Sequence, residues 1–129
     1  MGLDDTARAR ILLVEDETNI ALALKFLMRR EGYDVTHIAN GREALDQVEG
    51  LRPDLVLLDV TLPEVSGYEI CQRIKGTPSL CDTRVLILTA RGTEVEKRKA
   101  LALGADDFIS KPFETAQLTL SVAALLELG

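Results

Sequence analysis

Three short runs of consecutive apolar residues interrupt an otherwise mixed pattern of hydrophobic and polar positions. They cover residues 11–14, 54–59 and 84–88, and the second begins and ends on an aspartate. Runs of this length, rich in leucine and valine and bounded by turn residues, are typical of strands buried on both faces of a sheet. Two weaker segments, at 34–38 and 107–110, suit the edges of a sheet.

Segments with apolar residues at helical spacing separate these strands. They predict helices at 18–31, 43–48, 68–75, 93–103 and 114–128. Thr18 and Thr93 are in positions typical of N-caps, the second completed as a capping box by Glu96. Gly32 is in a position typical of the residue that ends a helix.

Strands and helices that alternate in this way predict an α/β fold with a doubly wound, five-stranded parallel sheet and five flanking helices. The three continuous runs belong inside the sheet, and the flavodoxin-like strand order 2-1-3-4-5 satisfies this requirement. We expect one domain over residues 1–129, with a flexible lead-in at 1–9. The order reverses between the first and third strands, so a crevice should open at their carboxyl ends.

Polar groups follow the carboxyl ends of four strands. Glu15 and Asp16 follow the first strand, Asp59 ends the third, Thr89 follows the fourth and Lys111 follows the fifth. Each alone would be an ordinary cap or surface residue. Together, three carboxylates favour a hard cation such as Mg²⁺, which would keep Asp59 ionised as a nucleophile toward phosphorus. The hydroxyl and the ammonium could then share the charge of the transferred phosphoryl oxygens.

With these residues in place, the chain resembles the receiver domain of two-component response regulators, of the chemotaxis-regulator type. The resemblance spans about residues 10–126 and rests on an ordered set of short motifs: Val14-Glu15-Asp16, Leu57-Leu58-Asp59, Pro63 with Ser66-Gly67, Leu88-Thr89-Ala90, and Gly104-Ala105-Asp106-Asp107-Phe108 through Lys111-Pro112-Phe113.

The resemblance implies a phosphoacceptor domain that depends on Mg²⁺. Asp59 would accept a phosphoryl group from the phosphohistidine of a sensor histidine kinase or a phosphotransfer protein. Asp16, Asp59 and the main-chain carbonyl of Thr61 would bind the metal, and Glu15 would act through water. Such a domain is a signalling switch rather than an enzyme, although it catalyses its own phosphorylation and dephosphorylation.

The resemblance also implies how the phosphoryl group is held and sensed. Lys111 and the backbone amide of Ala90 would contact the group, and the bond between Lys111 and Pro112 is expected to be cis. Thr89 would move toward the phosphoryl group and Phe108 would rotate inward behind it. An ordinary edge-strand aromatic packed on the core is a serious alternative for Phe108, although its position favours the switch. The surface of the helix at 93–103, the strand at 107–110 and the helix at 114–128 would then change for a partner.

Charge and composition narrow the remaining possibilities. The net charge of -6 argues against nucleic-acid binding by this domain itself. Cys71 and Cys81 show neither metal-site spacing nor a disulfide framework, which indicates free thiols in a reducing compartment. No segment is apolar enough to span a membrane, and residues 1–10 lack the apolar centre of a signal peptide, so we expect a cytoplasmic protein without a membrane partner.

Three other functional classes compete with this interpretation. A haloacid-dehalogenase-like phosphotransferase also uses an aspartate at a strand end, but it needs a second aspartate at the position of Thr61. A flavodoxin-like nucleotide or flavin module needs a glycine-rich loop after the first strand, where this chain has acids. A degenerate receiver acting only by protein binding would be expected to lack some of the reactive residues.

The last helix departs from the family pattern. It has no Lys or Arg after Lys111 and carries two apolar stripes, one of Leu118, Val122, Leu125 and Leu126 and another of Leu120, Ala124 and Leu128. Either a homodimer or docked partner covers the second stripe, or the helix continues into a linker of a longer chain.

Thr61 and Arg91 occupy positions that tune phosphoryl lifetime in the family. His37 is interpreted as an ordinary edge-strand residue.

Overall fold

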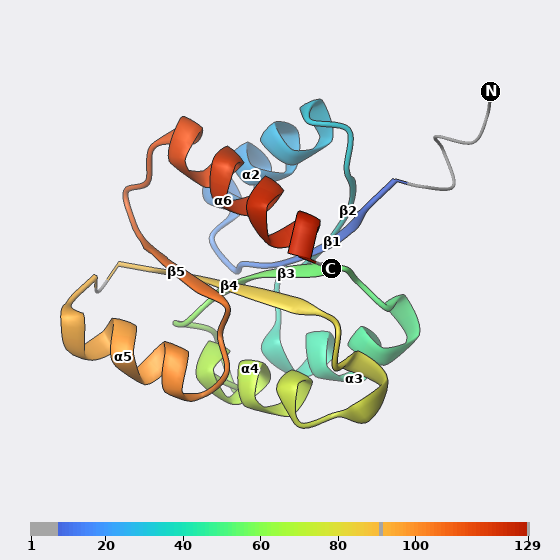
Figure 1. The fold of residues 1–129 in the computed structure, drawn as a ribbon, viewed down its shortest axis with the longest axis vertical. Coiled ribbons are helices and arrows are strands. Elements are labelled where there is room, and N and C mark those ends of the chain that lie inside the picture. The colour runs from blue at the N-terminus through green and yellow to red at the C-terminus, as the bar shows by residue number, and fades with distance from the viewer. Residues whose placement is uncertain (1–7, 91, 129) are drawn as a thin grey trace.

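Five parallel strands form the centre of the computed structural model, which describes residues 8–90 and 92–128 (Figure 1). The observed order, β2-β1-β3-β4-β5, confirms the predicted order 2-1-3-4-5. The strands are β1 (Arg10–Val14), β2 (Asp34–Ile38), β3 (Leu55–Asp59), β4 (Arg84–Thr89) and β5 (Asp107–Ser110).

Helices cover both faces of this sheet, as the alternation of elements predicts. Figure 1 shows two of them, α2 and α6, on one face, and α3, α4 and α5 on the other. Each face has its own hydrophobic core. The helices are α2 (Thr18–Arg30), α3 (Gly41–Leu51), α4 (Gly67–Lys75), α5 (Glu94–Ala102) and α6 (Thr115–Leu128), with a 3₁₀ turn, η1 (Pro78–Leu80), before β4.

The burial of the strands explains their order. All five residues of β3 are buried, and the strand pairs with β1 on one side and β4 on the other. The edge strand β2 instead alternates exposed and buried positions over most of its length. In the parallel register Val14 is opposite Leu58, and Asp59 is opposite Leu88. The carboxyl ends of β1, β3 and β4 therefore meet at one edge of the sheet.

Helix α2 ends where the sequence predicts but begins with a different cap. Gly32, in the left-handed conformation at φ 94°, follows its last turn. The N-cap is Glu17, whose side chain accepts a hydrogen bond from the backbone N–H of Asn19 at 3.3 Å. The prediction of Thr18 as N-cap is therefore wrong, because a carboxylate one residue earlier reaches the same free donors and Thr18 becomes the first helical residue.

Polar contacts connect helix α5 to α4. Thr93 caps α5 by accepting from the backbone N–H of Glu96 at 3.2 Å, as predicted. The Glu96 carboxylate accepts from the hydroxyl of Tyr68 on α4. The Lys99 ammonium lies 4.4 Å from the centre of the Tyr68 ring. Within α5, which the structure describes in full, Ala100 is the one buried residue.

The two apolar stripes of α6 have different surroundings. Leu118, Val122 and Leu125 are buried in the core that α6 shares with α2. On the other stripe Leu120 is 71% exposed and Ala124 is also exposed, whereas the side chain of Leu128 lies outside the described part of the structure. The second stripe is thus uncovered in the single chain as far as it is described, and a dimer or docked partner there stays a prediction.

Several further expectations concern the chain's ends and surface. The carbonyl of Ala9 accepts from the N–H of Asp34 at 2.8 Å, so pairing extends to the residue before β1. The rest of the lead-in up to residue 7, and Arg91, lie outside the described residues. Cys71 and Cys81 are free thiols, as predicted. Within residues 8–90 and 92–128 no helix is both long and apolar enough to cross a bilayer.

Candidate functional site

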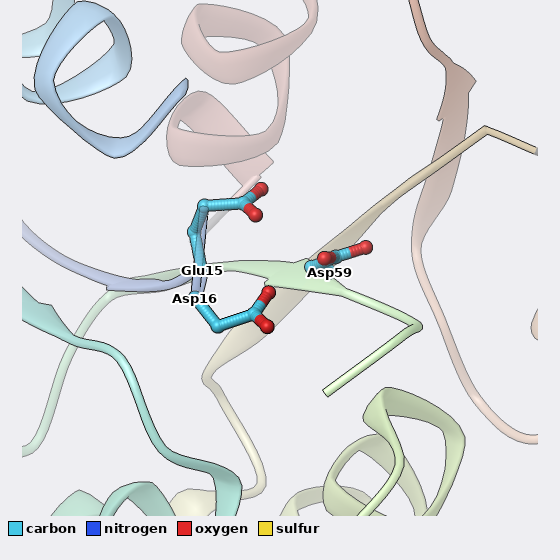
Figure 2. A group of neighbouring side chains, drawn as sticks. All are labelled: Glu15, Asp16 and Asp59. Atoms are coloured by element: carbon cyan, nitrogen blue, oxygen red, sulfur yellow. The ribbon is translucent and has the colours of Figure 1, made fainter. Parts of the chain in front are cut away.

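Three carboxylates converge at the carboxyl edge of the sheet (Figure 2). Glu15 and Asp16 directly follow β1, and Asp59 is the last residue of β3. Each offers an oxygen within 4.8 Å of the other two. Glu15 and Asp59 are only 1% and 6% exposed, whereas Asp16 is open to solvent. The structure therefore brings the predicted acidic cluster together, with two of its members inside the protein.

Lys111 lies between two of these acids. Its Nζ is 2.9 Å from Oε1 of Glu15 and 3.5 Å from Oδ1 of Asp59. Its backbone N–H donates to the carbonyl of Thr89 at 2.6 Å, and its peptide bond to Pro112 is cis, in agreement with the expectation. The turn after β5 thus places the ammonium inside the crevice rather than on the solvated surface.

Backbone and imidazole donors fix the orientation of the acids. The N–H of Thr61 donates to Oδ1 of Asp59 at 3.3 Å, and the N–H of Glu17 donates to Oε2 of Glu15 at 3.1 Å. His37, on the edge strand β2, donates from Nε2 to the carbonyl oxygen of Glu15 at 2.8 Å. No sequence signal pointed to this last contact, which fastens the backbone where the acidic pair begins.

The remaining predicted site residues line the crevice or stand behind it. Thr89, at the end of β4, is only 2% exposed. Ala90 is exposed and borders an apolar hollow of about 480 Å³ that Lys111 and Pro112 also line. Phe108 is partly buried against the core beneath α3, α4 and α5. These positions are compatible with both interpretations of Phe108, and the switch stays a prediction.

Gly67 closes the loop that follows Asp59. A Cβ atom at this residue would lie 2.1 Å from the carbonyl oxygen of Asp59 and 2.8 Å from Cα of Val60. The glycine N–H donates to the carbonyl of Val60 at 2.9 Å. Only a residue without a side chain allows the start of α4 to approach the end of β3 this closely. The sequence motif includes Gly67, but the close approach is visible only in the structure.

The environment of Asp59 disfavours its charge. Burial, and then the negative charge of Glu15, raise the pKa of the Asp59 carboxyl to about 6, against the lowering effects of the Lys111 ammonium and the Thr61 N–H. A hydrogen bond with the Glu15 side chain adds to the increase. A bound cation would counter the two leading causes of this shift, since it restores favourable interactions to the ionised form.

The donor set fits Mg²⁺. The three clustered side chains all offer carboxylate oxygens, the hard ligands that this ion prefers. Asp16 is exposed and can turn an oxygen toward an ion, Asp59 is held at Oδ1 by the Thr61 N–H, and Glu15 is already bound to Lys111, which suits contact through water. Exposed Asp16 leaves one side open to solvent, as an ion that keeps several waters requires.

Asp59→Asn is expected to change how stability depends on pH in metal-free buffer. The native carboxyl has a pKa of about 6, against an ordinary value of 3.8, so the native state binds more protons between these values. Wild-type stability should therefore fall relative to the variant as pH rises from 4 to 7, by about 1–3 kcal/mol. Urea unfolding at both pH values in EDTA measures this difference, and parallel pH profiles would contradict it.

Comparisons with known proteins agree with this geometry. Residues 11–123 match the family model described as the response regulator receiver domain. The chain is 41% identical over 117 residues to the phosphate regulon transcriptional regulatory protein PhoB of Rhizobium meliloti, covering 91% of this chain and 52% of PhoB. It is 40% identical over 122 residues to the DNA-binding response regulator MtrA of Mycobacterium bovis, covering 95% of this chain and 52% of MtrA. The chain thus spans about half the length of these curated relatives.

Solved structures give the same result. A putative response regulator from Chloroflexus aurantiacus superposes with a TM-score of 0.89 at 35% identity, covering 93% of this chain and 98% of that one. The receiver domain of the sensor histidine kinase PA1611 from Pseudomonas aeruginosa superposes with a TM-score of 0.85 at 29% identity, with 93% and 98% covered. That structure is described with a magnesium ion coordinated in its active-site cleft.

Proposed function

The chain belongs to the response regulator receiver domain family, and from that premise we propose that Asp59 is its phosphoacceptor. Asp59 would receive the phosphoryl group from the phosphohistidine of a sensor histidine kinase or a phosphotransfer protein. A receiver domain of a response regulator is a signalling switch. The observation that carries the assignment is the convergence of Glu15, Asp16 and Asp59 at one sheet edge, with the Lys111 ammonium 3.5 Å from Asp59.

The chain's own residues supply positioning and charge. The N–H of Thr61 holds one oxygen of Asp59, which leaves the other to attack phosphorus in line with the departing imidazole. The new bond joins an aspartate oxygen to phosphorus, and the bond from phosphorus to the histidine nitrogen breaks. Lys111, the Thr89 hydroxyl and the Ala90 N–H are assigned to the transferred oxygens, whose negative charge they share.

Mg²⁺ is assigned to Asp16, Asp59 and the main-chain carbonyl of Thr61, with Glu15 acting through water. When bound, it neutralises charge on the carboxylates and on the phosphoryl group. The fit of this ion rests on three carboxylate oxygens within 4.8 Å of one another. We assign both phosphorylation and dephosphorylation of Asp59 to this same arrangement, as activities of the domain itself.

The output surface is assigned to α5, β5 and α6. Thr89 and Phe108 connect it to the site, because Thr89 ends β4 and Phe108 lies on the neighbouring strand β5. Relatives such as PhoB and MtrA carry, by their descriptions, transcriptional and DNA-binding functions, and this chain covers about half of each. We propose that this domain controls a partner or output domain through that surface and does not itself bind nucleic acid, given its net charge of -6.

The proposal is tested by incubating the domain with acetyl phosphate, a small phosphoryl donor. We expect the intact mass to increase by one phosphoryl group in the presence of Mg²⁺ and not in EDTA, and peptide mapping to place the group on Asp59. A beryllofluoride complex formed only with Mg²⁺ would support the same assignment. No increase in mass, or an equal increase in EDTA, would contradict it.

A further inference from the structure

The loop at residues 60–66, called here the acceptor loop, connects Asp59 to α4 and carries Thr61. Its far half is attached to the start of α3. Asn40, the N-cap of α3, uses both ends of its amide group: Oδ1 accepts from the N–H of Glu43 at 3.1 Å, and Nδ2 donates to Oε2 of Glu64 at 3.1 Å. One side chain thus caps a helix and holds the acceptor loop.

Gly41, the first residue of α3, forms a second attachment. It is buried, and a Cβ atom there would lie 2.6 Å from the carbonyl oxygen of Val65 and 3.2 Å from Cδ1 of Ile70. Val65 itself is only 2% exposed. The missing side chain therefore lets the acceptor loop pack directly on the helix. A Cβ atom built in the same way on Gly50, near the other end of α3, would meet no atom of the described residues within 4 Å.

The segment that these contacts hold is strained. Glu64 has a φ of 65°, a left-handed conformation that costs a residue with a side chain about 1–2 kcal/mol. The N–H of Val65 donates to the carbonyl of Pro63 at 2.7 Å, across Glu64. A three-residue turn with positive φ at its centre is a rare γ-turn. Such a conformation persists where its surroundings fix it, and Asn40 holds the strained residue itself.

We propose that Asn40 and Gly41 are positioning residues for the Asp59 site, since they set the acceptor loop and with it the backbone of Thr61. The inference rests on the proposed function, because it takes that backbone to be a ligand of the metal. Separate elements then hold the acceptor loop at two points. Gly67, the first residue of α4, packs against the backbone of Asp59, and the start of α3 contacts the turn at Glu64 and Val65.

Four proteins test the Asn40 contact: wild type, Asn40→Asp, Glu64→Gln and the double variant. In Asn40→Asp the helix keeps a capping oxygen, but the donor to Glu64 becomes a second carboxylate facing it. We expect its affinity for Mg²⁺, measured by titration calorimetry without a phosphoryl donor, to fall about 3–10-fold. The melting temperature should change by no more than about 2 °C, since the loop contact is solvent-exposed.

The double variant should recover wild-type affinity. The glutamine introduced at position 64 would then donate to the aspartate introduced at position 40, which restores the hydrogen bond with donor and acceptor exchanged. Long-range electrostatic attraction alone predicts the opposite order of Mg²⁺ affinities. An added carboxylate strengthens cation binding, so Asn40→Asp would then bind Mg²⁺ most tightly of the four proteins. Wild-type or tighter affinity in Asn40→Asp, or a double variant as weak as Asn40→Asp, would overturn the inference.

A matched pair of glycine variants tests the second attachment. Gly41→Ala is expected to weaken Mg²⁺ binding and to slow phosphorylation by acetyl phosphate, whereas Gly50→Ala on the same helix should change neither. If Gly41→Ala does not fold, the four proteins of the Asn40 series test whether the start of α3 positions the acceptor loop. A wild type that binds Mg²⁺ but accepts no phosphoryl group would defeat the proposed function. Normal Mg²⁺ binding by Asn40→Asp would defeat only the present inference.

Discussion

Asp59→Asn is expected to abolish phosphorylation by acetyl phosphate, lowering the rate by about 10³-fold or more. The neutral amide is a poor nucleophile. Among the described residues, the other two carboxylates of the cluster follow β1, so neither can take the place of Asp59 at the end of β3. The measurement is intact-mass analysis over a time course at saturating Mg²⁺. Because this variant also relieves the repulsion between Glu15 and residue 59, it should remain folded, so that loss of labelling reports chemistry.

Asp54→Asn is the matched control. Asp54 precedes the same strand at its opposite end, where it is exposed and its Oδ2 accepts from the N–H of Arg10 at 2.8 Å. Its replacement should leave the rate of phosphorylation unchanged. If Asp59→Asn were phosphorylated at the wild-type rate and the group mapped to Asp16 or Glu15, another acid of the cluster would be the phosphoacceptor.

Gly67→Ala is expected to cause the largest loss of stability of any single methyl group added to this site. The new Cβ would lie 2.1 Å from the carbonyl oxygen of Asp59, and the atoms it meets belong to the backbone, which cannot rotate away as a side chain can. Overpacking of this kind costs about 1–3 kcal/mol, and we expect the upper end of that range. Urea unfolding at pH 7 in EDTA measures the change in the free energy of unfolding.

The same variant should also phosphorylate more slowly, because the backbone that must shift carries the acceptor. Gly50→Ala provides the control for the change of residue type, since its Cβ would enter open space. Gly50 is the last but one residue of α3, where replacing glycine with alanine gains less than the roughly 1 kcal/mol of a helix interior, so this control should be as stable as wild type or slightly more stable. Equal stability of Gly67→Ala and wild type would mean that the loop accommodates the methyl group without cost.

Much of this fold could be predicted because its central strands carry an unambiguous pattern. The apolar stretches 11–14, 55–58 and 85–88 are continuous, and the structure buries them in β1, β3 and β4. That assignment places the first, third and fourth strands inside the sheet, a requirement that the order 2-1-3-4-5 satisfies, and this order brings Glu15, Asp59 and Lys111 to one edge. Strand burial and the alternation of strands and helices together thus predict where the acids lie.

Other features depend on contacts that no local pattern contains. Asn40 and Glu64 are 24 residues apart, and Tyr68 and Glu96 are 28 apart, so their hydrogen bonds follow only from the packed arrangement of helices. The predicted cap of α2 is wrong by one residue because threonine and glutamate can both accept from the same free N–H groups. A helix cap is hard to predict because several neighbouring side chains can accept from the same N–H groups. A buried strand is easier to predict because few segments of a chain are apolar at every position.

The weak anchoring of α5 has a mechanical consequence. With a single buried residue, α5 has little apolar surface in the core, so the contacts of Glu96 and Lys99 with the hydroxyl and ring of Tyr68 on α4 contribute to its orientation. Tyr68 is the immediate neighbour of Gly67, which touches the backbone of Asp59. The path from Asp59 to α5 therefore runs through two adjacent residues, Gly67 and Tyr68, and ends on the α-helix with the fewest buried residues within the described part of the chain.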